Sequence, residues 1–252
     1  MPHFTSEGYE IAYSIYGEGP TILLVHGFGS NGKVNWVNTG WVEDLVAEGY
    51  RVVTIDNRGH GKSEKIYDTE AYPSSEMAKD SVNLIKFLGL KDVAIMGYSM
   101  GARISAYVSM SAPELIKCAV FGGLGERMTV GMSSSGVIVD ALLAPSLERI
   151  TDPTGRMFRI FAEHTKSDLK ALAACMGSSR QKISEDDVRK IKMPVLVAVG
   201  SEDVVGGRPE PLADLMEKGE SMVIEGRDHM RATGDKQFKQ GVLSFFSKQY
   251  PA

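Results

Sequence analysis

A serine between two glycines is the clearest chemical signal in the sequence. Residues 97–101 read Gly-Tyr-Ser-Met-Gly, with Ser99 at the centre. The apolar run at 93–96 precedes this motif, and a stretch of good helix formers follows it as far as Pro113. Ser99 is therefore expected on a turn between a buried strand and a helix. Such a turn exposes the hydroxyl beside the first helical N–H groups, which stabilise negative charge. The motif predicts a nucleophilic serine.

A serine nucleophile needs a base, and the sequence has five histidines. His229 follows the last expected strand and comes after Ser99, so we predict that it takes the serine proton. The other histidines lie near the N-terminus, in glycine turns ahead of Ser99, or on an expected helix: His3, His26, His60 and His164.

An acid should orient the imidazole from a neighbouring loop. Asp203 follows the expected strand at 194–199, which is the last but one in the chain, and is the predicted acid. Glu202 is one residue off this position. Asp228 adjoins His229 in sequence, which disfavours a good contact with Nδ1. We interpret Glu202 and Asp228 as solvated loop acids.

Negative charge on a substrate oxygen calls for two backbone N–H donors. Met100, directly after the nucleophile, is predicted to supply one. Phe28 is predicted to supply the other, because it lies in the turn that follows the apolar strand at 21–25. Glycines on both sides of Phe28 leave that turn free to adopt the required conformation.

Strands and helices alternate along most of the chain. This order predicts an α/β fold with a mostly parallel central sheet and helices on both faces. Strands are expected at 9–16, 21–25, 51–55, 93–96, 117–121, 194–199 and 221–225, and helices at 41–48, 75–88, 102–110, 209–218 and 233–248. In the helix at 75–88, Lys79, Asp80 and Lys86 are expected to face outward. A polar loop is expected through Thr39.

The alternation stops between 124 and 192, where no strong strand is visible. We expect a core formed by 1–123 and 193–252, with 124–192 inserted as a helical lid above the sheet. Apolar residues recur in the insertion at spacings that give helices an apolar face: Met128, Met132, Val137, Ile138, Leu142, Leu143, Met157, Phe158, Ile160, Phe161, Leu169, Leu172 and Met176. Most should pack the lid onto the core, and a few should contact a substrate.

Composition limits the possible functions. The formal net charge of −4 gives no indication of nucleic-acid or anionic-membrane binding. No apolar run approaches the roughly 18 residues of a membrane-spanning helix, and no secretory signal is visible. Cys118 and Cys175 lack metal-ligand spacing and are interpreted as reduced thiols. We expect a cytoplasmic protein without a metal site.

Together these motifs resemble the α/β-hydrolase superfamily, in its single-domain, lidded form. The similarity rests on residues 26–29, 56–63, 97–101, 200–203 and 228–229, which span nearly the whole chain. The resemblance implies a triad of Ser99, Asp203 and His229, an oxyanion hole formed by the N–H groups of Phe28 and Met100, and no cofactor. The turn at 56–63 is usually structural in this superfamily.

The resemblance leaves the substrate open. The leading hypothesis is hydrolysis of a small, apolar carboxylic ester through an acyl-enzyme intermediate. Carbon–carbon bond hydrolysis or perhydrolysis could use the same triad. A small-molecule receptor with a slow triad is the non-enzymatic alternative, and it would show very low turnover. If a charged substrate were preferred, the candidate anchors are Arg103, Arg127, Arg156 and Arg159.

Overall fold

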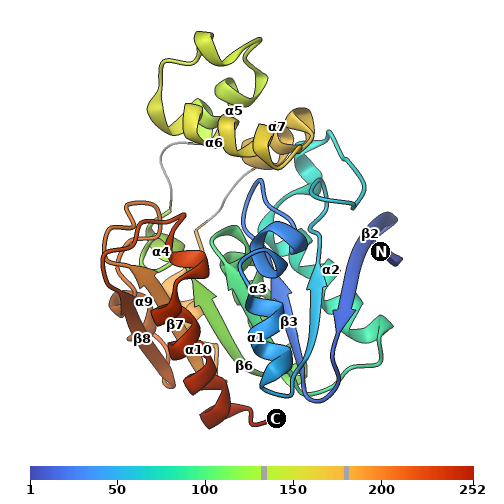
Figure 1. Ribbon diagram of the computed structural model, residues 1–252, viewed down its shortest axis with the longest axis vertical. Coiled ribbons are helices and arrows are strands. Elements are labelled where there is room, and N and C mark those ends of the chain that lie inside the picture. Colours follow the sequence, from blue (N-terminus) through green and yellow to red (C-terminus); the bar gives the residue numbers. More distant parts are fainter. Residues whose placement is uncertain (132–134, 179–181) are drawn as a thin grey trace.

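The computed structural model describes residues 1–131, 135–178 and 182–252. Its centre is an eight-stranded sheet in the order β1-β2-β4-β3-β5-β6-β7-β8 (Figure 1). Strands β1 and β2 pair antiparallel to their neighbours, and the pairs from β4 to β8 are parallel, which confirms the predicted mostly parallel sheet. The strands are β1 His3–Ser6, β2 Tyr9–Tyr16, β3 Thr21–Val25, β4 Arg51–Ile55, β5 Val93–Tyr98, β6 Ile116–Gly122, β7 Val195–Gly200 and β8 Gly219–Ile224.

Helices cover both faces of this sheet. The α-helices are α1 Trp41–Ala47, α2 Ser74–Phe87, α3 Met100–Ser111, α4 Arg127–Val130, α5 Ser135–Leu143, α6 Pro153–His164, α7 Leu169–Gly177, α8 Glu185–Val188, α9 Glu210–Ala213 and α10 Lys236–Gln249. Shorter helical turns are η1 Lys33–Val37, η2 Thr69–Ala71, η3 Pro113–Leu115, η4 Leu147–Arg149 and η5 Ala232–Gly234.

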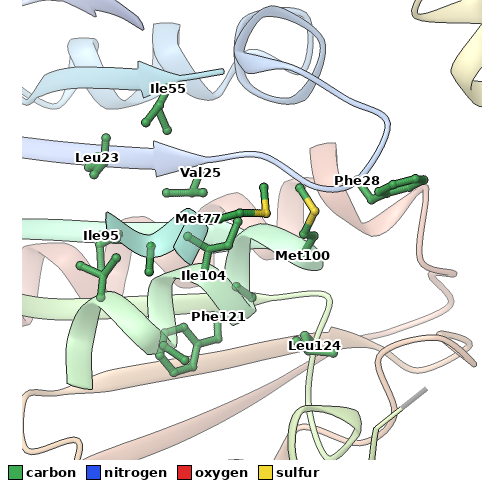
Figure 2. Close-up of a cluster of buried hydrophobic side chains, with 14 of the residues drawn as sticks. Leu23, Val25, Phe28, Ile55, Met77, Ile95, Met100, Ile104, Phe121 and Leu124 are labelled. Atoms are coloured by element: carbon green, nitrogen blue, oxygen red, sulfur yellow. The ribbon is translucent and has the colours of Figure 1, made fainter. Parts of the chain in front are cut away.

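Two hydrophobic cores follow from the alternation of side chains along the strands. In β3, Leu23 and Val25 face the core beneath α2 and α3, whereas Ile22 and Leu24 face the core beneath α1 and α10. Figure 2 shows the first core, with Met100 and Phe28 at one end of the cluster. Burying each large apolar side chain contributes about 1.5–3 kcal/mol. The packing that stabilises the sheet therefore extends to the residues predicted to surround Ser99.

Three local features differ from the sequence-based expectations. The expected loop before Thr39 contains a π-helix, η1, because Trp36 is fully buried there and anchors the segment. The N-terminal strand β1 was not predicted; it pairs antiparallel with β2 at the edge of the sheet. Helix α9 is four residues long, shorter than the stretch at 209–218.

Asp80 was expected to face outward, and this prediction is wrong. Its side chain is buried on the inner face of α2, where both carboxylate oxygens accept hydrogen bonds at 2.7 Å from the guanidinium of Arg58. Ser6 donates a further hydrogen bond at 2.6 Å. The buried cation of Arg58 in the turn at 56–63 therefore requires an anion on the inner face of the helix. In the same turn, Asp56 accepts hydrogen bonds from the backbone N–H groups of Gly32 and Lys62.

Replacing Asp80 with alanine should lower the free energy of unfolding by about 3–5 kcal/mol, because the Arg58 charge would stay buried without its partner. Urea denaturation measures this change. Glu76→Ala is the matched control on the same helix, since Glu76 forms an exposed ion pair with Lys79; exposed pairs contribute about 0–1 kcal/mol. Equal losses in the two variants would contradict a structural role for the buried pair.

Helices α5, α6 and α7 lie together at one end of the molecule, apart from the sheet (Figure 1). Asp152 and Asp168 cap the N-termini of α6 and α7 through their carboxylates. The proposed boundaries of the lid at 124 and 192 stay a prediction. Within these limits, residues 125 and 126 donate backbone hydrogen bonds to the loop at 206–208. The predicted apolar residue Met132 lies outside the described residues.

None of the helices in residues 1–131, 135–178 and 182–252 is both long enough and apolar enough to cross a bilayer.

Candidate active site

Ser99 occupies a strained turn between β5 and α3. Its φ of 55° falls in a region that side-chain-bearing residues rarely adopt, and such strain is commonly found at functional sites. The glycines on either side permit the turn: a Cβ on Gly97 would collide with the carbonyl oxygen of Gly101, and one on Gly101 with that of Val25. The motif therefore needs both glycines so that helix α3 can begin directly against the strands.

The structure brings Ser99, His229 and Asp203 together in one hydrogen-bonded row. His229 Nδ1 lies 2.7 Å from Asp203 Oδ2, and His229 Nε2 lies 3.0 Å from Ser99 Oγ. A carboxylate can only accept, so Nδ1 carries the proton and Nε2 accepts from the serine hydroxyl. This tautomer leaves the imidazole ready to remove the Ser99 proton.

The carboxylate of Asp203 is held on its other side by the backbone. Its Oδ1 accepts hydrogen bonds at 2.8 Å from the N–H groups of both Val205 and Gly206. Asp228 instead caps its own turn, with Oδ1 accepting from the N–H groups of Met230 and Arg231. Glu202 is exposed. Of the three acids considered from the sequence, the structure places Asp203 against the imidazole.

Tyr98 holds the backbone of His229. Its hydroxyl donates a 2.6 Å hydrogen bond to the His229 carbonyl oxygen, and the two rings lie 5.5 Å apart. Burial raises the pKa of Tyr98, so the phenol stays protonated and keeps its donor. The motif at 97–101 thus contributes Tyr98, as well as Ser99, and Tyr98 helps to fix the position of His229.

Phe28 lies in a tight turn at residues 27–30, which we call the oxyanion turn. The N–H of Ser30 donates to the Gly27 carbonyl oxygen at 3.3 Å, and Gly29 has a φ of 69°, as a type II turn requires at this position. A Cβ on Gly27 would lie 3.6 Å from the Ser99 Cβ, so the turn is adjacent to the nucleophile. Met100 is the first residue of α3, and its N–H has no acceptor within the helix.

Two buried side chains from the core fix the oxyanion turn at Gly27. His26 donates from Nδ1 to the Gly27 carbonyl oxygen at 2.7 Å, while its Nε2 accepts from the Asn57 N–H at 2.9 Å. Burial lowers the pKa of His26, which favours this neutral form. Asn35 accepts from the Gly27 N–H at 3.1 Å. The peptide between Gly27 and Phe28, whose N–H is the predicted donor, is therefore held at its carbonyl end.

A cavity of about 50 Å³ opens beside the serine. The lid contributes Phe158 and Phe161 to its wall. The other lining residues come from the core: Gly27, Phe28, Ser30, Asn35, Tyr98, Ser99, His229, Met230 and Thr233. The wall is mainly apolar near the two phenylalanines of the lid and polar near Ser30 and Asn35.

Known proteins share both the sequence pattern and the architecture. The family profile described as "alpha/beta hydrolase fold" matches residues 20–135. An esterase from Exiguobacterium antarcticum superposes with a TM-score of 0.80 at 20% identity, covering 96% of this chain and 98% of its own. The enol-lactonase from Burkholderia xenovorans superposes with a TM-score of 0.71 at 22% identity, covering 98% of this chain and 100% of its own.

The chain has the α/β-hydrolase fold. A non-heme chloroperoxidase from Kitasatospora aureofaciens is 25% identical to this α/β-hydrolase, over 97% of this chain and 98% of the relative. The two structural neighbours, at lower identity, establish the fold of the present chain and leave its reaction open.

Sequence reasoning missed three side chains that support the site of this α/β-hydrolase: His26, Asn35 and Tyr98. Tyr98 lies inside the serine motif, so its position was visible in the sequence, but its contact with His229 depends on tertiary structure. His26 precedes Ser99, which disfavours it as the base, and the sequence does not indicate its hydrogen bond to Gly27. Asn35 falls in the expected polar loop, and only helix η1 turns it toward Gly27.

Three of the four arginines considered as substrate anchors, Arg103, Arg156 and Arg159, have other partners in this α/β-hydrolase. Arg159 is buried and donates to the carbonyl oxygens at the end of α5 and to Glu163. Arg103 donates to the carbonyl oxygens of Arg127 and Met128. Among the described residues, no three or more His, Cys, Asp or Glu side chains are grouped as a metal ion would require.

Proposed function

We propose that this α/β-hydrolase cleaves a small, apolar carboxylic ester through an acyl-enzyme intermediate. The observation that carries the proposal is the unbroken row from Asp203 through His229 to Ser99, with contacts of 2.7 Å and 3.0 Å. A base aligned with the serine and an acid aligned with the base are the arrangement that nucleophilic catalysis by serine needs.

The first half of the proposed reaction acylates Ser99. His229 Nε2 takes the hydroxyl proton while Ser99 Oγ attacks the ester carbonyl carbon. The tetrahedral oxyanion then accepts hydrogen bonds from the N–H groups of Phe28 and Met100. As the carbon–oxygen bond breaks, His229 returns the proton to the departing alcohol. The Asp203 carboxylate stabilises the imidazolium that forms between these steps.

The second half releases the acid. A water molecule gives a proton to His229 Nε2 and attacks the acyl carbon, and a second tetrahedral oxyanion forms in the same place. Its collapse breaks the bond to Ser99 Oγ, which recovers the proton from His229. The free enzyme returns with Asp203 unprotonated. The proposed route uses protein groups and water, and no metal or organic cofactor enters any step.

The cavity supports a preference for short acyl groups. A space of about 10–15 Å³ is the least that holds one water, so 50 Å³ accommodates a few heavy atoms. Phe158 and Phe161 present aromatic carbon to that space, and no cationic side chain lines it among the described residues. An apolar acyl chain therefore gains by burial, whereas a carboxylate would lose its hydration without a partner.

The acyl-length dependence of kcat/KM should show this pocket directly. For nitrophenyl esters from acetyl to octanoyl, each buried methylene should raise kcat/KM about fourfold, from about 0.8 kcal/mol of transfer free energy. We expect the gain to stop at about the butyryl ester, where the cavity is full. A hemisuccinate ester should react more slowly than the butyryl ester.

Variants of helix α6 sharpen this test. Phe161→Ala should move the optimum to longer chains, because it enlarges the wall of the cavity. Ile160→Ala is the matched control, since its side chain is 47% exposed and does not line the cavity. A preference for the hemisuccinate, or a steady decline from the acetyl ester onward, would contradict the apolar acyl pocket.

Perhydrolysis on the same triad is the second candidate, favoured by the full-length match to a non-heme chloroperoxidase. Hydrogen peroxide would replace water in the second half of the reaction, and its oxygen would bond to the acyl carbon to give a peracid. Product analysis with and without peroxide separates the two outcomes. Peracid formation that needs Ser99 and exceeds hydrolysis would favour the peroxide reaction.

A further inference from the structure

The oxyanion turn is also attached to the lid. Thr165, at the end of α6, donates from Oγ1 to the Gly29 carbonyl oxygen at 2.8 Å. Ser167 Oγ lies 3.3 Å from the same oxygen and 2.9 Å from Thr165 Oγ1. Gly29 directly follows Phe28, whose N–H is the proposed oxyanion donor. We call the pair Thr165 and Ser167 the lid clamp.

Donor counting indicates which of these contacts holds the turn. Thr165 has one hydroxyl proton and three carbonyl oxygens within reach, those of Gly29, Phe161 and Ala162. The latter two already accept backbone N–H groups, from Thr165 and Ser167 respectively. Gly29 is also the shortest contact. The proton therefore goes to Gly29, and Ser167 can donate to Thr165 Oγ1, which strengthens the chain of hydrogen bonds.

Two further features show that this connection is closely fitted. Lys166, between the two clamp residues, has a φ of 54°, a strained conformation for a residue with a side chain. On the preceding helix, Phe161 packs directly on Gly29, since a Cβ there would lie 3.3 Å from its ring. The same ring lines the cavity beside Ser99. One lid segment thus contacts both the substrate space and the oxyanion turn.

A second attachment stands beside the clamp. Tyr67, in the core loop before η2, donates to Asp168 Oδ2 at 3.0 Å, while Asp168 Oδ1 caps α7. The turn from α6 to α7 is therefore tied to two separate core loops. These two attachments together hold the clamp residues in place against Gly29.

We propose that Thr165, supported by Ser167, is a positioning residue for the oxyanion hole. The core holds the turn at Gly27 through His26 and Asn35, and the lid holds it at Gly29. Phe28 lies between Gly27 and Gly29, so its N–H keeps its direction only when the hydrogen bonds at both glycines are formed. The inference rests on the proposed acyl transfer at Ser99. It adds that docking of the lid completes the site that stabilises the oxyanion.

The rate of Ser99 labelling by a fluorophosphonate tests the clamp. Phosphonylation also places negative oxygen in the oxyanion hole, so the probe reports the hole whether or not an ester is the substrate. Loss of a whole oxyanion donor costs about 10²–10³ in rate, and a loosened one should cost about tenfold. We therefore expect Thr165→Val to label about tenfold more slowly, and Ser167→Ala to show a smaller loss.

Two companion variants separate positioning from stability. Thr165→Ser keeps the hydroxyl and should restore the labelling rate. Thr129→Val removes an equally half-buried hydroxyl that bonds a carbonyl within its own helix, away from the turn, and should label at the wild-type rate. For nitrophenyl butyrate, Thr165→Val should lower kcat and leave KM nearly unchanged, because the oxyanion forms only in the transition state.

Labelling of Thr165→Val at the wild-type rate, or an equal loss in Thr129→Val or Thr165→Ser, would overturn the clamp. Absence of ester turnover in the wild-type enzyme, with Ser99 still labelled, would overturn the proposed ester reaction alone. In that case the labelling rates of the four variants still decide whether the lid positions the turn.

Discussion

Ser99→Ala should remove ester hydrolysis while leaving the fold intact. The remaining groups of the site cannot form the acyl intermediate, because the atom that bonds to the substrate is gone. In a serine protease the loss of the nucleophile costs on the order of 10⁶ in kcat, and a comparable fall is expected here. Steady-state hydrolysis of nitrophenyl butyrate measures the change.

The control lies on the helix that begins at the nucleophile. Ser111, at the far end of α3, is exposed, so Ser111→Ala should keep the wild-type kcat. A fluorophosphonate should label the wild-type and Ser111→Ala enzymes at Ser99 and leave Ser99→Ala unlabelled. Full hydrolytic activity in Ser99→Ala would refute the proposed mechanism as a whole.

Asp203→Asn should lower kcat by about 10⁴-fold. An amide keeps the size of the carboxylate, but it can present N–H to His229 Nδ1 while its oxygen accepts from Val205 and Gly206 as before. The imidazole would then carry its proton on Nε2 and could no longer accept from Ser99. The measurement is kcat for the same ester at a fixed pH.

Glu202→Gln is the matched control for this substitution. The two acids are adjacent in sequence, and both changes replace a carboxylate with its amide, yet Glu202 is exposed and Asp203 is 6% exposed. Glu202→Gln should therefore change kcat little. The reverse ranking of the two variants would show that the acid has been assigned to the wrong position.

The sheet and the positions of the predicted site residues follow from strong local signals. Continuous apolar runs identify β3, β5 and β7, since a strand covered on both faces has no need of polar residues. Ser99, Asp203 and His229 each come just after such strands or in the last loop. Because carboxyl ends of parallel strands meet at one edge, their proximity could be predicted without knowledge of distances.

Other parts depend on contacts between distant segments, which local patterns do not reveal. Asp80 looks like a solvent-facing residue of α2 until Arg58 is placed beneath the helix. His26 and Asn35 have no periodicity that indicates their bonds to Gly27. The contact between Thr165 and Gly29 joins residues far apart in sequence, and it depends on how the lid docks.

The most direct test of the central claim is to find the acyl group on the enzyme. Wild-type protein is mixed with nitrophenyl butyrate, quenched in acid during the first turnovers, digested and analysed by mass spectrometry. The peptide containing Ser99 is expected to gain the mass of one butyryl group, and fragmentation should place this group on Ser99. A burst of nitrophenol with the butyryl group on another residue, or with no acylated peptide, would contradict nucleophilic catalysis by Ser99.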